Sequence, residues 1–486
     1  MGAASGTAQA AEAGIGEVAF EAALAAIRAA ERTYLRIGRV TASSDEYQDP
    51  AAFCEALTRT ALDGTAFADT QARVRFFAWA TDRAPRAKLL PVVACADLLA
   101  HAEARLARMY AERALGVNQN DLYAQALYDR CHPERPADPD LRGRFCSNPF
   151  DKLETLSRGE VYFCCPAWQP IPIGNLESQS AAEIWNSPAA QDIRRSILDG
   201  SYRYCSRMHC PKLTAQSLPK AADVTNREHR GFIAARQTRL ERGPRRLVLN
   251  HDRSCNLSCP SCRTRLIVAG KAEQERMNQI ADRVLKPLFA HARKVHITAG
   301  GDAFGSAHYR YVLRSISRER PAGLRVDLQT NGLLMAPSWD ELQLDGLVDR
   351  VYVSIDATRA STYELVRRGG SFERLLDNLA FAAEKRRKGL ISHVRLDFVV
   401  QTLNFREMPE AVELVRRFGF DGLKFQMIRS WNTYSPEEFA WHNIGSPDHP
   451  QFAELLEVLR DPRLRAGFVE FWGFHSVEPG ALPAAS

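Results

Sequence analysis

Three cysteines that follow a short apolar run are the residues best suited to chemistry in this sequence. Cys255, Cys259 and Cys262 are spaced C-x3-C-x2-C within "LVLNHDRSCNLSCPSC". Three thiolates on one tight loop can bind three irons of a [4Fe–4S] cube and leave the fourth iron open to an outside ligand. A structural zinc site needs four closed ligands, and no fourth cysteine or histidine completes this set locally. The spacing therefore favours an open iron–sulfur cluster, with a zinc knuckle or three unrelated thiols as the alternatives.

Four more cysteines lie upstream and could form a second metal site. Cys146, Gly159 and Cys164 are spaced C-x12-G-x4-C, and Cys205 and Cys210 follow as C-x4-C. Four thiolates suit a fully ligated [4Fe–4S] cluster, and in a tetrahedral array they also suit Zn²⁺. The spacing is therefore compatible with an iron–sulfur cluster and with a zinc ion. The other cysteines are expected to be bystanders: Cys54, Cys95, Cys131 and Cys165.

The elements that must position the cysteine triplet alternate between strands and helices. Six short apolar, β-rich runs occupy residues 246–250, 294–298, 325–329, 350–355, 393–401 and 422–428. Amphipathic stretches lie between them, at residues 272–292, 306–318, 371–388 and 406–418. Nearly continuous apolar strands that alternate with helices indicate a parallel sheet covered by helices. We therefore expect an α/β fold with a partial (β/α)6 TIM-like barrel, whose functional residues follow the carboxyl ends of its strands.

This cysteine loop and the strand ends that follow it resemble the radical S-adenosylmethionine (radical SAM) superfamily over about residues 245–430. In that family the open iron of a [4Fe–4S] cluster chelates the amino and carboxylate groups of SAM. One electron then breaks a C–S bond of SAM, and the resulting 5′-deoxyadenosyl radical abstracts hydrogen from a substrate. The resemblance implies both cofactors here, with Cys255, Cys259 and Cys262 as the ligands of the SAM-binding cluster.

The same resemblance implies which strand ends contact SAM. In "VHITAGGD", Gly300, Gly301 and Asp302 match the segment that contacts the SAM amino group, with Asp in place of the usual Glu. In "VYVSIDA", Ser354 and Asp356 match the region of the ribose and the carboxylate. Further candidates are Gln401 and Asn404, the backbone near Met427 for adenine, and Arg367 or Arg368 for the SAM carboxylate. A solvated helix end is the alternative for both arginines.

The upstream cysteine set lies in a segment that resembles the SPASM/twitch extension of radical SAM maturases, including a "GNL…IWNS…R" pattern. The resemblance implies a probable second [4Fe–4S] cluster, the auxiliary cluster. Its ligands would be Cys146, Cys164, Cys205 and Cys210, with His209 as a possible substitute. This chain departs from the family in two ways, because the extension usually follows the barrel and its full form carries two clusters. A structural or substrate-positioning role is therefore expected before a role in electron relay.

The chain of 486 residues is long enough for several domains. The predicted segments are a flexible tail (1–16), a helical, possibly repeat-like region (17–131), a cluster module (143–212), a connector (213–243), the barrel (244–430) and a C-terminal extension (431–486). An all-α region and a small Cys-rich, SPASM-like module thus precede the barrel.

Composition limits the compartment and the partners. The formal net charge of +6 is mild for this length, so nucleic acid is not expected as a partner. The N-terminus lacks the basic start and the apolar core of a signal peptide, and no run of 18 apolar residues predicts a membrane span. A cytoplasmic location is expected, where clustered thiols stay reduced.

We therefore expect a radical SAM enzyme that acts on a peptide or protein, as maturases do. The alternatives are a small-molecule reaction, namely oxidation or epimerisation of a sugar or aminocyclitol, and a non-catalytic metal-binding scaffold or binding protein. The family implies a flavodoxin- or ferredoxin-type electron donor as a further partner.

Overall fold

The protein is described by a computed structural model. It describes residues 19–31, 58–59, 61–62, 67, 69–84, 87, 89–117, 127–128, 130–131, 140–169, 171–207, 210–297, 300–431, 433–474 and 477. The chain divides into two compact units. The first contains residues 1–150, 161–174 and 182–241, and the second contains residues 151–160, 175–181 and 242–486. Cys54, His209 and the predicted tail lie outside the described residues.

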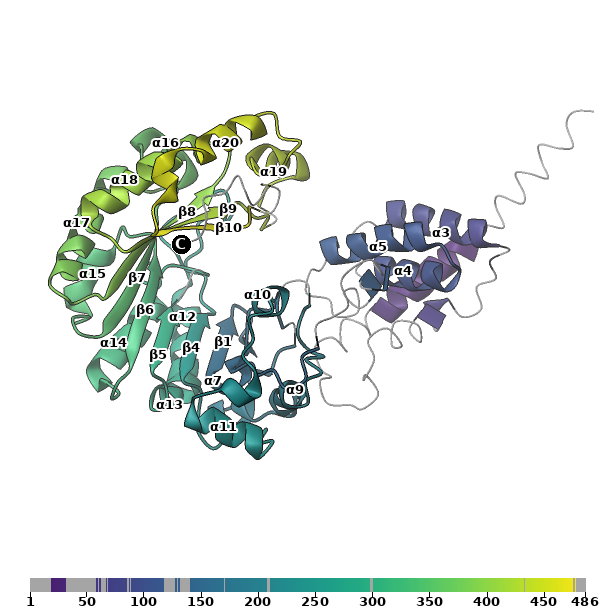
Figure 1. Ribbon diagram of the computed structural model, residues 1–486, viewed down its shortest axis with the longest axis horizontal. Coiled ribbons are helices and arrows are strands. Elements are labelled where there is room, and N and C mark those ends of the chain that lie inside the picture. The colour runs from purple at the N-terminus through teal and green to yellow at the C-terminus, as the bar shows by residue number, and fades with distance from the viewer. Residues whose placement is uncertain are drawn as a thin grey trace, which may run out of the picture. The chain divides into compact units, whose positions relative to one another are not determined.

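A curved parallel sheet forms the centre of the second unit, and its helices cover the outer face (Figure 1). The six predicted strands are all present, as β4 (Arg246–Asn250), β5 (Lys294–Ile297), β6 (Arg325–Thr330), β7 (Val348–Ser354), β8 (His393–Val400) and β9 (Gly422–Met427). Each pairs in parallel with the next along the chain. The predicted α/β class with a partial barrel is confirmed.

Helices follow the strands in the predicted order. They are α12 (Lys271–Ile280), the π-helical turn η3 (Ala281–Leu285), α13 (Lys286–Phe289), α14 (Ala307–Glu319), α15 (Met335–Glu341), α16 (Ala360–Val366), α17 (Phe372–Arg387), the short η4 (Phe405–Glu407) and α18 (Met408–Phe418). Ser306 and Ser371 accept a backbone N–H at the starts of α14 and α17, which fixes where these helices begin.

Four further strands extend the barrel sheet beyond the six predicted ones, and two of them pair directly with barrel strands. Strand β1 (Lys152–Leu156) pairs in parallel with β4, and β10 (Val469–Trp472) pairs in parallel with β9. The sheet order is β10-β9-β8-β7-β6-β5-β4-β1-β2-β3, where β2 is Glu160–Tyr162 and β3 is Gly174–Asn175. Both edges of the six-stranded barrel are therefore paired by strands that the sequence analysis assigned to flanking segments.

The remaining elements are short helices. The cluster region contains α7 (Asn148–Asp151), α8 (Ala181–Trp185), α9 (Pro188–Leu198), α10 (Pro211–Thr214), η2 (Ala221–Asp223) and α11 (Arg227–Ala234). After the barrel come α19 (Pro436–His442), α20 (Phe452–Leu459) and η5 (Pro462–Arg465).

The described N-terminal residues form an all-α region, as predicted. Its labelled helices are α3 (Thr70–Arg83), α4 (Leu90–Ala100) and α5 (Ala104–Val117). Their shared core includes Cys95 and Cys131, whose sulfurs lie 3.7 Å apart. Within the ranges given above, no helix is both long and apolar enough to cross a bilayer.

Candidate functional site

The cysteine triplet lies on the loop that follows β4 and lines a cavity of about 270 Å³ at the carboxyl ends of the barrel strands. The backbone N–H of Cys255 donates to the carbonyl of Ile267 (2.9 Å), which folds the loop back on itself. The N–H groups of Cys262 and Arg263 both donate to the carbonyl of Cys259 (3.0 Å each). Cys255 and Cys259 are buried and Cys262 is half-buried. The structure thus gathers the three predicted thiols around one space.

A side-chain nitrogen of another residue lies near each of these three sulfurs. Asn331 Nδ2 lies 3.7 Å from the Cys255 sulfur, Arg367 Nη1 lies 3.9 Å from the Cys259 sulfur, and Arg263 Nη2 lies 3.4 Å from the Cys262 sulfur. Such donors stabilise negative charge on sulfur.

Burial opposes the thiolate form of Cys255 and Cys259. It raises the pKa of Cys255 to about 11 and also raises the pKa of Cys259 above its ordinary value. A bound cation beside these thiols would favour their ionised form. A soft, three-thiol set on one cavity fits iron, and we propose Cys255, Cys259 and Cys262 as the cluster ligands.

Gly300 and Gly301, after β5, pack directly against the cysteine loop. A Cβ atom at Gly301 would lie 2.4 Å from the carbonyl oxygen of Ser254 and 2.7 Å from that of Asp252. The carbonyl of Gly300 accepts from Arg263 Nη2 (3.3 Å). The glycines are therefore needed for loop-to-loop contact, and Gly301 also lines the cavity.

Asp302 lines the cavity, but its carboxylate is already engaged within the chain. Oδ1 accepts from the backbone N–H groups of Phe304 (3.0 Å) and Gly305 (2.8 Å). Oδ2 accepts from Thr330 Oγ1 (2.9 Å) and from the N–H of Asn331 (2.7 Å). Asp302 thus joins the ends of β5 and β6. Its contact with the SAM amino group stays a proposal, and it would have to form in addition to these four hydrogen bonds or replace some of them.

Asp356, after β7, forms a buried ion pair at the cavity. Its backbone adopts a left-handed conformation (φ +56°), and its Oδ1 accepts from the N–H of Val399 (2.7 Å). Its Oδ2 pairs with Arg367 Nη2 at 2.8 Å, and both side chains are buried. Burial raises the pKa of Asp356, and the Arg367 guanidinium opposes that rise. Ser354 also lines the cavity and accepts from Gln329 Nε2 (3.2 Å).

The structure distinguishes between the two arginines that the sequence analysis considered for the SAM carboxylate. Arg367 lines the cavity, and its buried Nε has no hydrogen-bond partner among the described residues. Arg368 is exposed and donates to Ser258 Oγ (3.1 Å) and to the carbonyl of Thr264 (3.3 Å). Arg367 is therefore the candidate partner for an anionic group of a ligand, while Arg368 fixes the cysteine loop.

Two other candidates at the strand ends, Gln401 and Asn404, stabilise a neighbouring turn. Asn404 Nδ2 donates to the carbonyl of Asp356 (2.8 Å), and its Oδ1 accepts from the N–H of Gln401 (2.8 Å). Both are buried and support the turn that carries Asp356. Near Met427 it is the next residue, Ile428, that lines the cavity.

Sequence reasoning missed the wall of the cavity formed by β6, β8 and β9. Asp397 accepts from Gln329 Nε2 (3.0 Å) and pairs with Arg395 (2.7 Å) and Lys424 (3.2 Å). Gln329, Asp397 and Lys424 all line the cavity. The signal was available, because a charged residue inside the apolar run "HVRLDFVV" implies an inward-facing polar site.

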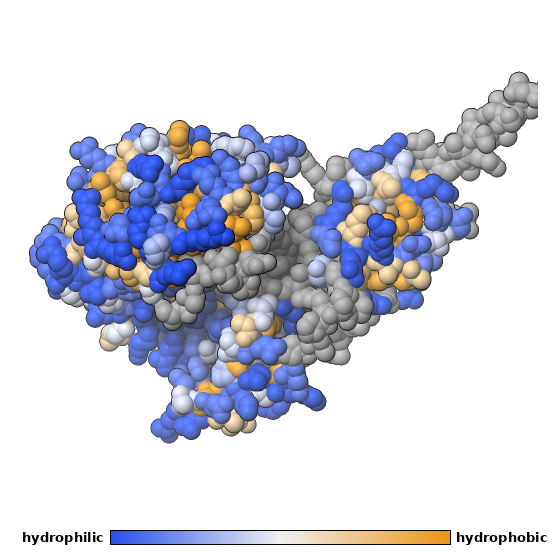
Figure 2. All heavy atoms as spheres, turned by 45° about the horizontal axis from the view of Figure 1, so that its top comes forward, coloured by the Kyte–Doolittle hydropathy of each residue, from blue (hydrophilic) through white to orange (hydrophobic). Residues whose placement is uncertain are grey.

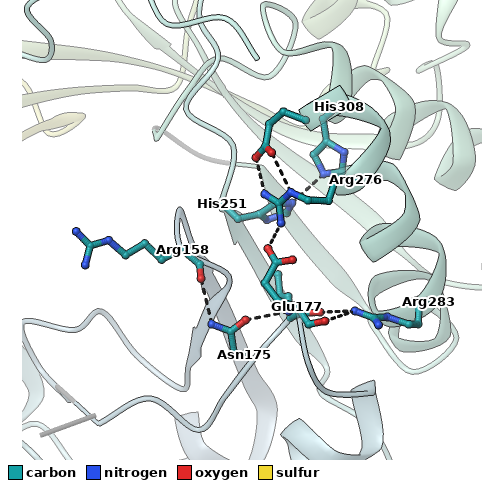
Figure 3. A network of polar contacts seen from close by, with 9 residues as sticks. Arg158, Asn175, Glu177, His251, Arg276, Arg283 and His308 are labelled. Carbon is teal, nitrogen blue, oxygen red and sulfur yellow. Dashed lines mark hydrogen bonds and ion pairs between the residues drawn. The ribbon is translucent and has the colours of Figure 1, made fainter. Parts of the chain in front are cut away.

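A buried histidine pair lies just before the cysteine loop (Figure 3). His251 Nε2 lies 2.8 Å from His308 Nε2, while His251 Nδ1 contacts Thr155 Oγ1 (2.8 Å) and His308 Nδ1 contacts Asn278 Oδ1 (2.8 Å). Burial lowers the pKa of His251 to about 3 and that of His308 to about 4. The pair connects β1, the end of β4, α12 and α14 while both rings are neutral.

We expect this pair to make the protein acid-labile. The unfolded histidines titrate near pH 6.5, so below that pH the unfolded chain binds protons that the folded chain cannot. The free energy of unfolding keeps its full value above about pH 6.5. As the pH falls to 5, it decreases by about 2 kcal/mol for each histidine. Anaerobic urea unfolding at pH 5 to 8 should show this loss. The double substitution His251→Gln and His308→Gln should reduce it and leave the share of His296, whose pKa burial also lowers to about 4. An unchanged pH dependence in that variant would contradict the assignment.

A polar network beside the pair holds the segment that follows β3 to the barrel helices (Figure 3). Glu177 pairs with Arg276 of α12, which also pairs with Glu273. Arg283, in the π-helical turn η3, donates to the carbonyls of Leu176 and Glu177 (2.8 Å each). Residues 175–181 are thereby part of the barrel unit.

The upstream cysteines also come together, within the first unit. Cys205 lies close enough to interact electrostatically with Cys146, Cys164 and Cys210, and burial followed by these neighbours raises its pKa. Asn148 Nδ2 lies 3.1 Å from the Cys164 sulfur.

These four thiols are neighbours within the first unit. In the described part of the chain, no three Cys, His, Asp or Glu side chains form a site for a single metal ion. A zinc site would need its four sulfurs about 2.3 Å from one ion, whereas a cube spreads its ligands over separate irons. Four thiolates that lie close together can ligate an iron–sulfur cluster, and we propose Cys146, Cys164, Cys205 and Cys210 as its ligands.

Arg194 organises the fold around these four cysteines, a role that the sequence analysis did not foresee. It is fully buried, and it donates to the carbonyls of Pro149 (2.9 Å), Trp185 (2.8 Å) and Thr238 (2.8 Å). It also donates to Asn186 Oδ1 (3.3 Å) and lies over the Trp185 ring (4.5 Å). The "IWNS…R" pattern is therefore a structural signature, because its tryptophan, asparagine and arginine are in contact.

Replacing Arg194 with alanine should destabilise the cluster region. Each buried acceptor left without a donor costs about 1–3 kcal/mol, so we expect a loss of several kcal/mol. Limited proteolysis should cut residues 143–240 faster, and iron content should fall. The control is Arg195→Ala on the same helix, because Arg195 is half exposed and its ion pair is with Asp192, one turn earlier. That variant should resemble wild type, and equal behaviour of the two would refute the role of Arg194.

Two family matches cover the two cysteine sets. Residues 249–423 match the model of the radical SAM superfamily. These residues form a radical SAM domain. Residues 146–211 match SPASM, described as an iron–sulfur cluster-binding domain, so this domain precedes the radical SAM domain in the chain. The predicted resemblances to the radical SAM superfamily and to SPASM are confirmed over these residues. A radical SAM domain implies a [4Fe–4S] cluster and SAM, and an SPASM domain indicates additional iron–sulfur clusters.

Named relatives resemble the radical SAM domain at modest identity. An AdoMet-dependent heme synthase of Methanosarcina barkeri is 29% identical over 190 residues, which are 37% of this chain and 49% of that protein. A probable GTP 3',8-cyclase of Methanocaldococcus jannaschii is 23% identical over 185 residues, 36% of this chain and 56% of that protein. The chain thus spans about half the length of the curated relatives it matches.

Solved structures of radical SAM proteins also match. Streptococcus suis SuiB bound to S-adenosylmethionine is 16% identical, with a TM-score of 0.34 over 55% of this chain and 61% of that one. The protein anSMEcpe with bound AdoMet is 18% identical, with a TM-score of 0.32 over 46% of this chain and 63% of that one.

Proposed function

We propose that this protein cleaves SAM reductively and uses the 5′-deoxyadenosyl radical to abstract hydrogen from a peptide or protein substrate. One observation carries the proposal: three thiols share a single cavity with the polar ends of β5, β6 and β7. The bound cluster would supply one electron and an open coordination position for SAM.

The chain's own residues define how SAM would be held. Arg367 offers a buried guanidinium for the carboxylate of the ligand, and Asp356 keeps that guanidinium in the cavity. Gly301 lets backbone approach the ligand closely, and Ser354 offers a hydroxyl on the neighbouring strand. Residues Gly300, Gly301, Asp302, Ser354 and Asp356 remain our proposed SAM contacts.

The SPASM domain supports a peptide or protein as the substrate class, because it resembles the extension of radical SAM peptide maturases. The radical SAM relatives named above include a heme synthase and a probable GTP cyclase, so the barrel alone does not select the substrate.

Deuterium transfer tests the substrate class. The anaerobically reconstituted protein is incubated with SAM, dithionite and a deuterated candidate peptide encoded beside its gene. We expect deuterium in 5′-deoxyadenosine and a mass change in the peptide, with neither in Cys255→Ala. Transfer from a labelled sugar or aminocyclitol, and none from peptides, would replace the peptide proposal. No 5′-deoxyadenosine at all would favour a non-catalytic scaffold.

A further inference from the structure

One side of the cavity takes no part in the proposed contacts with SAM. Lys424 and Gln426 of β9, and Ile428 just after it, line the cavity at every second position, as one face of a strand does. Arg429 and Trp431 continue this lining. We name these five residues the β9 wall. Hydrogen abstraction requires the substrate to lie beside SAM, so the β9 wall is the part of the cavity that is left for the substrate.

The carboxylate of Asp397, beside Lys424, already accepts several hydrogen bonds from within the chain. Its Oδ1 accepts from Arg395 Nε (2.7 Å), and its Oδ2 accepts from Gln329 Nε2 (3.0 Å) and Arg395 Nη2 (3.2 Å). Lys424 Nζ lies 3.2 Å from the same Oδ2. A carboxylate accepts about four hydrogen bonds, so Asp397 has little capacity left for a cation of the substrate.

Lys424, in contrast, keeps N–H groups and positive charge available on the cavity side. An ammonium group has three N–H donors, and the described ion pair of Lys424 is with Asp397 alone. Arg395 and Lys424 share this one carboxylate. Glu470 also approaches Arg395 Nη1 (4.0 Å), but its side chain is 54% exposed and water screens its charge. The buried group therefore carries more positive than negative charge.

A second cation of the β9 wall lies where the cavity meets solvent. Arg429 is exposed and forms no ion pair or side-chain hydrogen bond with the part of the chain that the structure describes. The face of the protein in Figure 2 is mainly hydrophilic, with apolar residues in separate spots. That face offers no broad apolar surface to a substrate, so charge is the property that the β9 wall can select. Both of its cations favour an anionic group.

We propose that Lys424 binds a carboxylate of the substrate inside the cavity and that Arg429 attracts this carboxylate to the cavity mouth. In a peptide the carboxylate belongs to an aspartate or glutamate side chain near the hydrogen that is abstracted. The inference rests on the proposed function and adds to it the charge of the substrate. It is separate from the SAM carboxylate, whose proposed partner is Arg367, held by Asp356 after β7.

The test measures binding without turnover, on the full-length reconstituted protein with SAM and without a reductant. Three pools of random heptapeptides with amidated C-termini differ only at the central residue, which is glutamate, glutamine or lysine, and contain no other acidic residue. Ultrafiltration and mass spectrometry give the bound fraction of each pool. A second arm compares glutarate with glutaramide, which distinguishes an acidic peptide from a small acid.

Two variants remove the two cations separately. Lys424→Met removes the ammonium group but leaves Asp397 hydrogen-bonded to Arg395 and Gln329, so the fold should be retained. Arg429→Gln changes an exposed side chain. The matched controls are Lys271→Met and Arg387→Gln, which make the same changes at exposed positions outside the cavity lining. Iron content and the denaturant midpoint confirm that each variant is folded.

We expect the wild type to bind the glutamate pool about tenfold more than the glutamine or lysine pool. Lys424→Met should remove this preference. Arg429→Gln should weaken it at low salt, with less effect as salt is added. Both controls should behave as wild type, and the affinity for SAM should be unchanged in all variants.

Three results would overturn the carboxylate site. They are equal binding of acid and amide in both arms, stronger binding of the lysine pool, and a wild-type preference in Lys424→Met. A loss of SAM affinity in Lys424→Met would also overturn it, because Lys424 would then bind SAM. Binding of glutarate over glutaramide, with no preference among the peptides, would support the site and refute a peptide substrate. Because binding does not require SAM cleavage, failure of the proposed function would be seen separately.

Discussion

Replacing Cys255 with alanine should remove about half of the bound iron and abolish SAM cleavage. Two [4Fe–4S] clusters would give the wild type about eight irons per chain, and loss of one cluster would leave about four. Cys255 is buried on the cavity and its loop is held by the bond to Ile267, so no neighbouring thiol can replace it without moving the loop. Iron analysis and the electron paramagnetic resonance spectrum of the reduced protein would measure the loss.

The matched control is Cys165→Ala, which removes a cysteine that neither proposed cluster uses. It should keep about eight irons and full formation of 5′-deoxyadenosine. A wild type with about four irons would contradict the auxiliary cluster, and a Cys255→Ala variant that keeps all its iron would contradict the assignment of the triplet.

Replacing Arg367 with glutamine should be the most damaging single change in the cavity that leaves the cysteines intact. The side chains of Arg367 and Asp356 are 12% and 4% exposed, and their ion pair is 2.8 Å long. Removing one partner of such a pair leaves a buried charge unpaired and costs about 3–5 kcal/mol. SAM binding should weaken as well, because the cavity would lose its buried guanidinium.

A double substitution separates stability from binding in this pair. Asp356→Asn together with Arg367→Gln removes both charges and keeps the acceptor for the N–H of Val399. It should recover most of the free energy of unfolding lost by Arg367→Gln, but not the affinity for SAM measured by equilibrium dialysis. If Arg367→Gln unfolds at the wild-type denaturant concentration, the pair does not stabilise the fold as described here.

The barrel and the cysteine loop could be predicted because their signals are local. Six apolar runs became six strands, and the C-x3-C-x2-C loop followed the first of them. The residues after the strands then met at one edge, since parallel strands bring their carboxyl ends together. The cavity therefore contains Gly301, Asp302, Ser354 and Asp356, as the resemblance implied.

The missed features depend on contacts between distant parts of the chain. Strand β1 is only five residues long, and its place beside β4 comes from pairing across about ninety residues, which no local pattern reveals. Arg194 looked like an ordinary helix residue, because its burial depends on carbonyls that come from Pro149 and Thr238. The choice between Arg367 and Arg368 likewise required knowing how the chain turns after α16, because only Arg367 lines the cavity.

One measurement tests the central claim most directly. The anaerobically reconstituted protein is reduced with dithionite and mixed with SAM, and 5′-deoxyadenosine is quantified against the Cys255→Ala variant. We predict formation of 5′-deoxyadenosine by the wild type and only background from the variant. Background levels from a wild type that carries its full complement of iron would contradict the assignment of the cavity as a site of SAM cleavage.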